Sequence, residues 1–298
     1  MKKSPFYRGK VRDLYEVDDE RMIIVSTDRI SAFDVVFSEA IPKKGIYLNE
    51  ISSLWFWYLQ NKPSRLFPQK TLTTALNFKT HFITNDLSEF PEPFCHIDEW
   101  NQRAMLVYKT KRIDFECVVR GYLLGSAWKE YQATQKVSGI ALKPGLKFGD
   151  ALPEFLFTPT TKEELGKHDI NVDFEYMQEK IGSTLAQRLK EISLSLFKEA
   201  KEIYDSIGFI LCDTKFEFGI RNGEIYLIDE VLTPDSSRFW KKGNEKKKDS
   251  YDKQILRDYL EKISWDKNSP PPPIPQDIIS ELQSRYEEIY LRLKEVLV

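Results

Sequence analysis

The chain has 298 residues, of which 41% are hydrophobic, so it can bury one large core or two lobes that share a cleft. Its 44 Lys and Arg residues nearly balance 46 Asp and Glu residues, which argues against a nucleic-acid-binding or membrane-surface protein. Three widely spaced cysteines form no CxxC pair, which argues against a disulfide framework or a cysteine zinc site. We therefore expect a cytoplasmic protein without a signal peptide or a transmembrane helix.

The N-terminal third of the sequence predicts strands. Residues 11–17 and 21–26 have the composition of strands, and Gly9 precedes the first of them. A glycine turn between two strands can lie over phosphates, as it does in protein kinases, whereas a Walker loop would need the pattern GxxxxGK[ST]. Residues 103–109 predict a further strand, and residues 110–114 predict the hinge between two lobes.

The middle of the chain predicts a buried strand at 115–123. Arg120 ends its apolar run, where a charge is either half of a structural ion pair or a ligand-binding group. Gly125-Ser126 opens a helix, and backbone N–H groups and a hydroxyl at a helix start suit an anion. Residues 136–170 predict an irregular loop rich in Gly and Pro, and residues 173–207 predict a long helical region.

Residues 211–220 predict a strand with two unlike faces. Alternation places Asp213, Lys215 and Glu217 on one face and apolar side chains on the other. The charged face does not help a core, because burying unpaired charges costs several kcal/mol. Hard cations such as Mg²⁺ prefer oxygen ligands and often accompany phosphates. This face therefore predicts a site for a divalent cation and a charged substrate.

Asn222-Gly223 predicts a hairpin, because both residues tolerate positive φ. A two-residue turn would put Asp229 on the apolar face and Glu230 beside Glu217. A three-residue loop at 221–223 would instead place Asp229 beside Glu217. The pattern alone leaves both registers open, and a bulge could decide between them.

The C-terminal quarter predicts surface and packing elements. The charged run at 241–248 is typical of a solvated loop, and the prolines at 270–273 predict a stiff spacer. Asp277 is the predicted cap of a final amphipathic helix. His81 and His96 are isolated, and we expect no catalytic imidazole at either.

Six blocks of this sequence resemble one family, phosphoribosylaminoimidazole-succinocarboxamide synthase (SAICAR synthetase), in its order and spacing. They are YRGKVRDLY at 7–15, STDRISAFD at 26–34, PKKG at 42–45, ECVVRGYLLGSAWKEY at 116–131, FTPTTK at 157–162, and LCDTKFEFGI with IDEVLTPDSSR within 211–238. The resemblance covers nearly the whole chain. It implies an ATP-dependent ligase of purine biosynthesis that joins L-aspartate to an imidazole carboxylate nucleotide through an acyl phosphate.

The resemblance also implies roles for particular residues. The ATP site would comprise Gly9, Lys10, Val11, Arg12 and Lys109, together with the Mg²⁺ ligands Glu217 and Asp229. The imidazole nucleotide would be held by Arg120, Ser126 and Arg238, and the aspartate site would lie near Lys162 and His168. Lys215 would offset charge on the transferred phosphoryl group, and the candidates to accept the amine proton are Asp34 and Asp235. Glu230 is the alternative to Asp229 as the second metal ligand.

The implied fold is α+β, with two lobes, a kinase-like ATP cleft and a C-terminal helix. We predict an N-terminal ATP-binding lobe at 1–110 and a larger substrate-binding lobe at 111–298. The expected partners are the small-molecule substrates alone, without nucleic acid or membrane, and the sequence does not indicate an oligomeric state. A different ATP-dependent small-molecule kinase or ligase on a related fold is the alternative function.

Overall fold

The computed structural model of the chain describes residues 4–162, 170–243 and 249–298. An antiparallel sheet in the N-terminal part has five strands in the order β1, β2, β3, β8, β7. These strands are β1 (Tyr7–Arg8), β2 (Arg12–Glu16), β3 (Arg21–Ser26), β8 (Ala104–Tyr108) and β7 (Phe82–Thr84). The predicted strands at 11–17, 21–26 and 103–109 are thus confirmed. A separate ribbon pairs β4 (Arg29–Ala32) with β5 (Val35–Ala40).

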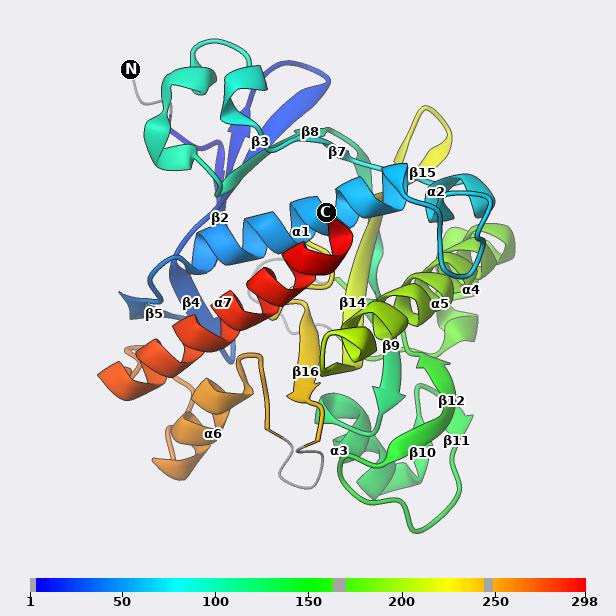
Figure 1. Cartoon of the computed structure of the whole chain (residues 1–298). Helices are drawn as coiled ribbons and strands as arrows, with labels where there is room; N and C mark the ends of the chain where they lie inside the picture. The colour runs from blue at the N-terminus through cyan, green and yellow to red at the C-terminus, as the bar shows by residue number, and fades with distance from the viewer. Residues whose placement is uncertain (1–3, 163–169, 244–248) are drawn as a thin grey trace.

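A second sheet forms the larger part of the molecule, and its long strands are β9 and β14 (Figure 1). Its main strands, in spatial order, are β12 (Ala151–Phe157), β9 (Lys111–Tyr122), β14 (Phe209–Arg221), β15 (Glu224–Ile228) and β6 (Lys79–Thr80). Two short strands extend it, β13 (Thr160–Thr161) beside β9 and β16 (Ser237–Lys241) beside β14. A small ribbon of β10 (Lys136–Val137) and β11 (Ile140–Ala141) lies next to it.

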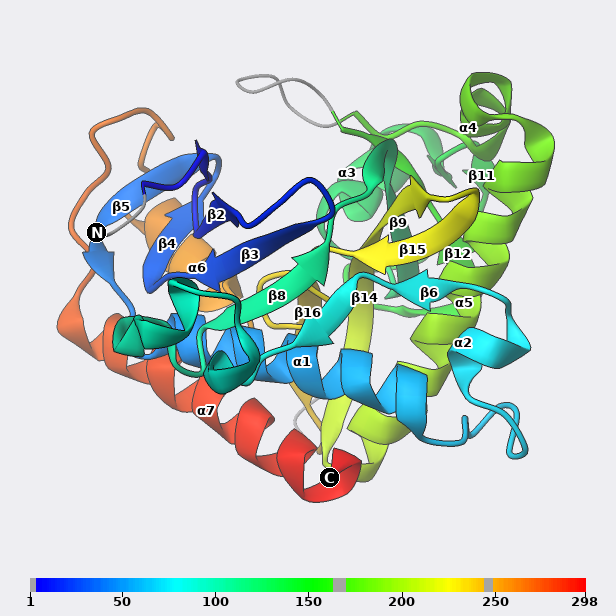
Figure 2. The same cartoon turned by 90° about the horizontal axis from the view of Figure 1, so that it is seen from above.

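Helices cover both sheets and complete the predicted α+β class. They are α1 (Lys44–Asn61), α2 (Leu72–Ala75), α3 (Gly125–Thr134), α4 (Phe174–Ile181), α5 (Ser183–Ser206), α6 (Gln254–Lys262) and α7 (Gln276–Leu297), with 3₁₀ turns η1 (Leu87–Glu89), η2 (Phe94–His96) and η3 (Asp98–Trp100). Helix α5 packs on β14 and β9, while α7 runs alongside α1 (Figures 1 and 2). Phe216 and Phe218 of β14 are fully buried in the same core as Phe197 of α5.

Three sequence expectations need correction. The segment 136–170 contains β10 to β13, because β10 pairs with β11, and pairing with β9 orders β12 and β13, which have no strong strand pattern of their own. The helical region 173–207 is broken at Gly182, whose φ of 85° does not continue a helix. The final helix begins at Gln276 after Pro275, so Asp277 lies in its first turn instead of capping it.

The chain passes from the first sheet to the second between β8 and β9. However, β6 from the N-terminal part pairs with β15, and α7 packs against α1. The division into lobes at 1–110 and 111–298 therefore stays a prediction. Within the described ranges, none of the helices carries an apolar segment long enough to cross a lipid bilayer.

Candidate active site

The site is built on the charged face of β14. Register with β9 places Glu116 opposite Glu217 and Arg120 opposite Asp213. Directly paired residues of an antiparallel ladder share a face, so β9 extends the charged surface of β14. Glu116 is a site residue that the sequence analysis missed, although its alternation with buried Cys117 on β9 could have indicated it.

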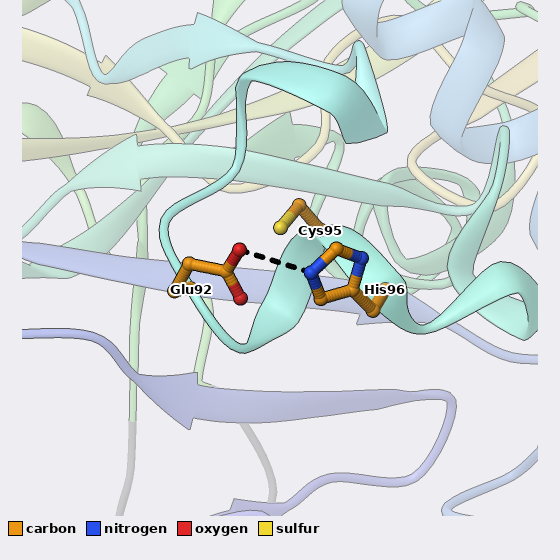
Figure 3. A group of neighbouring side chains, drawn as sticks. All are labelled: Glu92, Cys95 and His96. Atoms are coloured by element: carbon orange, nitrogen blue, oxygen red, sulfur yellow. Dashed lines mark hydrogen bonds and ion pairs between the residues drawn. The ribbon is translucent and has the colours of Figure 1, made fainter.

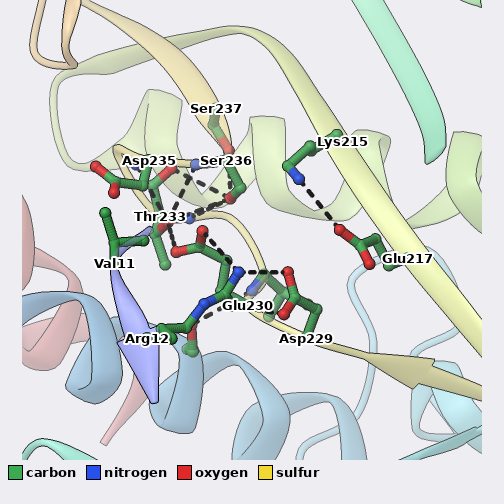
Figure 4. Close-up of polar contacts among 12 residues, drawn as sticks. Val11, Arg12, Lys215, Glu217, Asp229, Glu230, Thr233, Asp235, Ser236 and Ser237 are labelled. Atoms are coloured by element: carbon green, nitrogen blue, oxygen red, sulfur yellow. Dashed lines mark hydrogen bonds and ion pairs between the residues drawn. The ribbon is translucent and has the colours of Figure 1, made fainter. Parts of the chain in front are cut away.

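At one end of this face, carboxylates surround Lys215. Lys215 points toward Glu217 (Figure 4), and its Nζ lies 3.1 Å from Glu217 Oε1 and 2.8 Å from Glu116 Oε1. Lys162 contacts the other carboxylate oxygen of Glu217. Burial would lower the pKa of Lys215, but Glu217 and Glu116 raise it well above its ordinary value. Lys215 therefore stays a cation. We call the four acidic side chains at this end of the face, Glu116, Glu217, Asp229 and Glu230, the carboxylate cluster.

The hairpin of β14 and β15 has the register of a two-residue turn. Glu217 pairs with Ile228 across an Asn222-Gly223 turn, so the three-residue loop at 221–223 is wrong. The inference that this register sends Asp229 to the apolar face is also wrong. Strand β15 ends at Ile228, and Asp229 has a φ of 68°, which turns its side chain away from the strand alternation.

Arg12 links the first sheet to the carboxylate cluster. Its guanidinium points toward Asp229 and Glu230 (Figure 4). It lies 2.6 Å and 2.8 Å from the two carboxylate oxygens of Asp229 and 3.7 Å from Glu230 Oε1. Burial would raise the pKa of Asp229, but Arg12 and the nearby lysines hold it well below its usual range. Asp229 is thus an ionised carboxylate beside the other acidic groups of the site.

The glycine turn before β2 has the predicted strand–turn–strand form. The Gly9 amide donates to the Arg12 carbonyl at 2.8 Å, and Arg29 donates to the carbonyls of Gly9 and Lys10 at 3.0 and 3.1 Å. The Lys10 ammonium lies 2.5 Å from Asp34, so two predicted site residues meet here. Val11, the remaining residue of the turn, accepts from the Thr27 amide at 3.0 Å.

Lys109 directly follows β8, the last strand of the first sheet in chain order. Its ammonium lies 2.5 Å from Glu16 Oε1, and its amide donates to the Glu20 carbonyl at 2.8 Å. These contacts fix the backbone at the connection to the second sheet, where the family resemblance implies part of the ATP site.

A cavity of about 160 Å³ extends from Lys215 along the β14 face to Arg120 and Arg238, and its lining includes both basic and acidic side chains. Arg120 donates from Nε to Thr158 at 2.9 Å, from Nη2 to Ser126 at 3.1 Å, and from Nη1 to Asp213 at 3.3 Å. Arg238 lies 2.5 Å from the same Asp213 carboxylate. The structure therefore brings the three predicted nucleotide-binding residues together, and Asp213 is a further residue that holds the two guanidinium groups side by side.

Asp235 also lines this cavity, but its carboxylate is 1% exposed and paired. The carboxylate lies 2.8 Å from the fully buried Lys44 and 3.3 Å from Lys253, and it accepts from the Tyr286 hydroxyl at 3.2 Å. Burial would raise the pKa of Asp235, but Lys253 and Lys44 hold it well below its usual range. Such a carboxylate is a weak proton acceptor, a point that the sequence pattern did not indicate.

The remaining histidine predictions have different outcomes. His168 lies outside the described residues. His81 is 1% exposed, and burial lowers its pKa to about 4, so it is a neutral core imidazole. His96 lies on the surface in the loop between β7 and β8.

Comparisons with known proteins identify the family. A family model described as SAICAR synthetase matches residues 5–272. The chain belongs to the SAICAR synthetase family. A phosphoribosylaminoimidazole-succinocarboxamide synthase of Geotalea uraniireducens is 46% identical over 290 residues, which are 96% of this chain and 93% of that protein. The corresponding protein of Thermodesulfovibrio yellowstonii is 48% identical over 287 residues, covering 95% and 92%.

Solved structures agree with this assignment and confirm the predicted SAICAR-synthetase-like fold. The SAICAR synthase of Saccharomyces cerevisiae, solved in complex with SAICAR, has a TM-score of 0.82 and 38% identity, over 98% of this chain and 94% of that one. A SAICAR synthetase solved in complex with ADP has a TM-score of 0.67 and 26% identity, and the alignment covers 97% of each chain.

Proposed function

We propose that this chain joins L-aspartate to 5-amino-1-(5-phosphoribosyl)imidazole-4-carboxylate, with conversion of ATP to ADP and phosphate, in purine biosynthesis. Family membership over nearly the whole chain supports this ligase activity. The observation that carries the assignment to particular residues is the shared face of β14 and β9. It joins a cavity in which Arg120 and Arg238 suit an anionic substrate to a carboxylate cluster that suits a metal–nucleotide complex. We place the enzyme in the cytoplasm, with small molecules as its partners.

The nucleotide phosphates would lie between the glycine turn and the carboxylate cluster. Gly9, Lys10, Val11 and Arg12 would surround them, and the adenine would lie beside Lys109. Arg12 and Lys215 already bridge acidic groups in the cluster, and phosphate oxygens can replace these carboxylates as their partners. That exchange would release the carboxylates for a metal ion.

The carboxylate cluster suits Mg²⁺ by its donor chemistry. Its four carboxylates, those of Glu116, Glu217, Asp229 and Glu230, form ion pairs with three cationic side chains. The three cations are Arg12, Lys162 and Lys215. Hard cations take carboxylate oxygens, and we assign Glu217 and Asp229 as the protein ligands. When bound, the ion would neutralise charge on the nucleotide phosphates.

The substrate carboxylate needs activation, because its oxygen is a poor leaving group when an amine attacks. In the proposed reaction, a carboxylate oxygen attacks the γ-phosphorus, ADP leaves, and an acyl phosphate forms. The aspartate amine then attacks the acyl carbon, and inorganic phosphate leaves with the former carboxylate oxygen. Lys215 would offset the charge that develops during phosphoryl transfer, and Arg120 and Arg238 would hold the imidazole nucleotide by its anionic groups.

The attacking amine must lose a proton. Asp34 is more than half exposed beside Lys10, whereas Asp235 is held in its buried ion pair. We therefore favour Asp34 as the proton acceptor. Asp235 would instead position Lys253, which lines the cavity. Lys162, which contacts Glu217, is assigned with His168 to the aspartate site.

The direct test of the activity is the substrate dependence of ADP release. ADP should appear at a sustained rate only when ATP, the imidazole carboxylate nucleotide and L-aspartate are all present. Sustained ADP release without aspartate would contradict the ligase assignment and would favour the alternative, a small-molecule kinase.

We expect Asp229→Asn to lower kcat more than Glu230→Gln does. Asp229 faces Arg12 and the cluster, whereas Glu230 accepts from Thr233 in the turn that follows. Loss of a charge-assisted contact costs about 1.5–3 kcal/mol, so Asp229→Asn should reduce kcat by roughly 10–150-fold. Parallel kcat measurements over a range of Mg²⁺ concentrations check this, and a larger loss in Glu230→Gln would transfer the metal-ligand role to Glu230.

We expect Arg120→Lys to raise the KM for the imidazole nucleotide by roughly 10–150-fold, the equivalent of a lost charge-assisted hydrogen bond. Lysine keeps the charge but lacks the fork that reaches Thr158, Ser126 and Asp213 together. The KM for ATP should stay within a few-fold and serves as the internal control. A collapse of ATP affinity would place Arg120 in the nucleotide site.

A further inference from the structure

A second group of side chains with metal-ligand chemistry lies outside the carboxylate cluster, in the loop between β7 and β8. Glu92, Cys95 and His96 each offer a ligand atom there, and these atoms all lie within 4.8 Å of one another. Figure 3 shows the three side chains gathered at the turn that leads into η2. Glu92 Oε1 already lies 2.9 Å from His96 Nε2.

The ligand chemistry is that of a borderline transition metal. Thiolate and imidazole ligands select ions such as Zn²⁺ and Co²⁺, whereas Mg²⁺ prefers oxygen. Zn²⁺ binds sulfur at about 2.3 Å and nitrogen or oxygen at about 2.0–2.2 Å, which puts neighbouring ligand atoms roughly 3.5 Å apart in a tetrahedron. The widest spacing of 4.8 Å exceeds that of a closed site by roughly 1.3 Å, and rotation of the exposed Glu92 and His96 side chains can close the difference. We propose that Glu92, Cys95 and His96 bind one Zn²⁺-like ion.

The surroundings favour a cation and hold the ligands in place. Residues 86–100 contain five carboxylates, Asp86, Glu89, Glu92, Asp98 and Glu99, and no Lys or Arg. Phe94, between the ligands in sequence, is 1% exposed and stacks on Trp100 at 5.8 Å between ring centroids. The turn that carries Cys95 and His96 is therefore anchored to the core of the N-terminal sheet. A bound ion would tie Glu92 to this anchored turn.

The test is a Co²⁺ titration of the full chain in excess Mg²⁺, followed by displacement with Zn²⁺. We expect one equivalent of Co²⁺ to bind with a near-ultraviolet thiolate-to-cobalt charge-transfer band, and Zn²⁺ to abolish that band. Cys95→Ser should remove the band. His96→Ala and Glu92→Gln should weaken binding by at least roughly tenfold, since even outer-shell partners are worth about 10–100-fold in metal affinity.

Glu89→Gln is the matched control, because it removes the same charge from the same loop without removing a ligand. It should lower the affinity for Co²⁺ by far less than Glu92→Gln does. Equal losses of affinity in the two variants would mean that the loop attracts cations only by its overall negative charge, which would contradict the proposed site. A band that persists in Cys95→Ser, or no band in the unaltered chain, would overturn the proposal.

Alkylation gives a second readout that does not depend on cobalt spectra. Cys95 is half-buried, whereas Cys117 and Cys212 are fully buried in the folded chain. Cys95 should therefore react with a thiol reagent in the native protein, and equimolar Zn²⁺ should slow that reaction while Mg²⁺ does not. Equal rates with and without Zn²⁺ would contradict the proposed thiolate ligand.

Discussion

Glu217→Gln should lower kcat by about 10²–10³-fold at saturating Mg²⁺, by analogy with the loss of one preorganised electrostatic contact at a reacting centre. Glu217 is 4% exposed and lies opposite Glu116, between Lys215 and Lys162. The amide keeps the shape of the side chain but loses the negative charge that a metal ion and both lysines require. The measurement is steady-state turnover with all three substrates saturating.

Glu224→Gln is the matched control for this variant. Glu224 lies at the other end of the same hairpin, where it forms an exposed pair with Lys79. Its turnover should match that of the unaltered enzyme. Near-normal turnover of Glu217→Gln would contradict the assignment of Glu217 as a metal ligand.

Asp235→Asn should lower the free energy of unfolding by about 3–5 kcal/mol, because it leaves a buried charge uncompensated. The charge is that of Lys44, whose side chain is fully buried 2.8 Å from Asp235. The contribution of this carboxylate is present above the ordinary Asp pKa of 3.8, and it is lost as the pH falls through the lower pKa of the folded state. Urea denaturation at neutral pH measures the difference.

Asp114→Asn provides the comparison for this effect, because Asp114 forms an exposed pair with Arg112. Exposed ion pairs contribute little, so this variant should unfold almost as the unaltered chain does. If Asp235→Asn is equally stable, the buried pair does not hold α1 to the turn that precedes β16. The account of Asp235 as a positioning residue would then be wrong.

The charged face of β14 could be predicted because strand alternation is a local property. Glu217 and Lys215 follow directly from a period of two in the sequence. The side of the sheet on which Asp229 lies could not be predicted in this way, because it depends on where β15 ends. The backbone leaves the strand after Ile228 with positive φ, and Arg12 from the other sheet holds the new orientation.

Tertiary pairing explains the other misses. The burial of Asp235 depends on Lys44, which lies far away in the sequence, so no local pattern reports it. Strand β12 forms because β9 offers an edge to residues that look irregular by themselves. The sequence left open whether Arg120 forms a structural ion pair or binds a ligand. In the structure, Arg120 pairs with Asp213 and also lines a cavity, so it combines both features.

The most direct test of the central claim follows oxygen from the imidazole carboxylate. If the enzyme activates that carboxylate by phosphoryl transfer, one carboxylate oxygen must leave with phosphate when aspartate attacks. Substrate labelled with ¹⁸O in the carboxylate, incubated with ATP, Mg²⁺ and L-aspartate, should give inorganic phosphate that carries ¹⁸O. Unlabelled phosphate formed alongside the amide product would contradict carboxylate activation and with it the proposed roles of Lys215 and the carboxylate cluster.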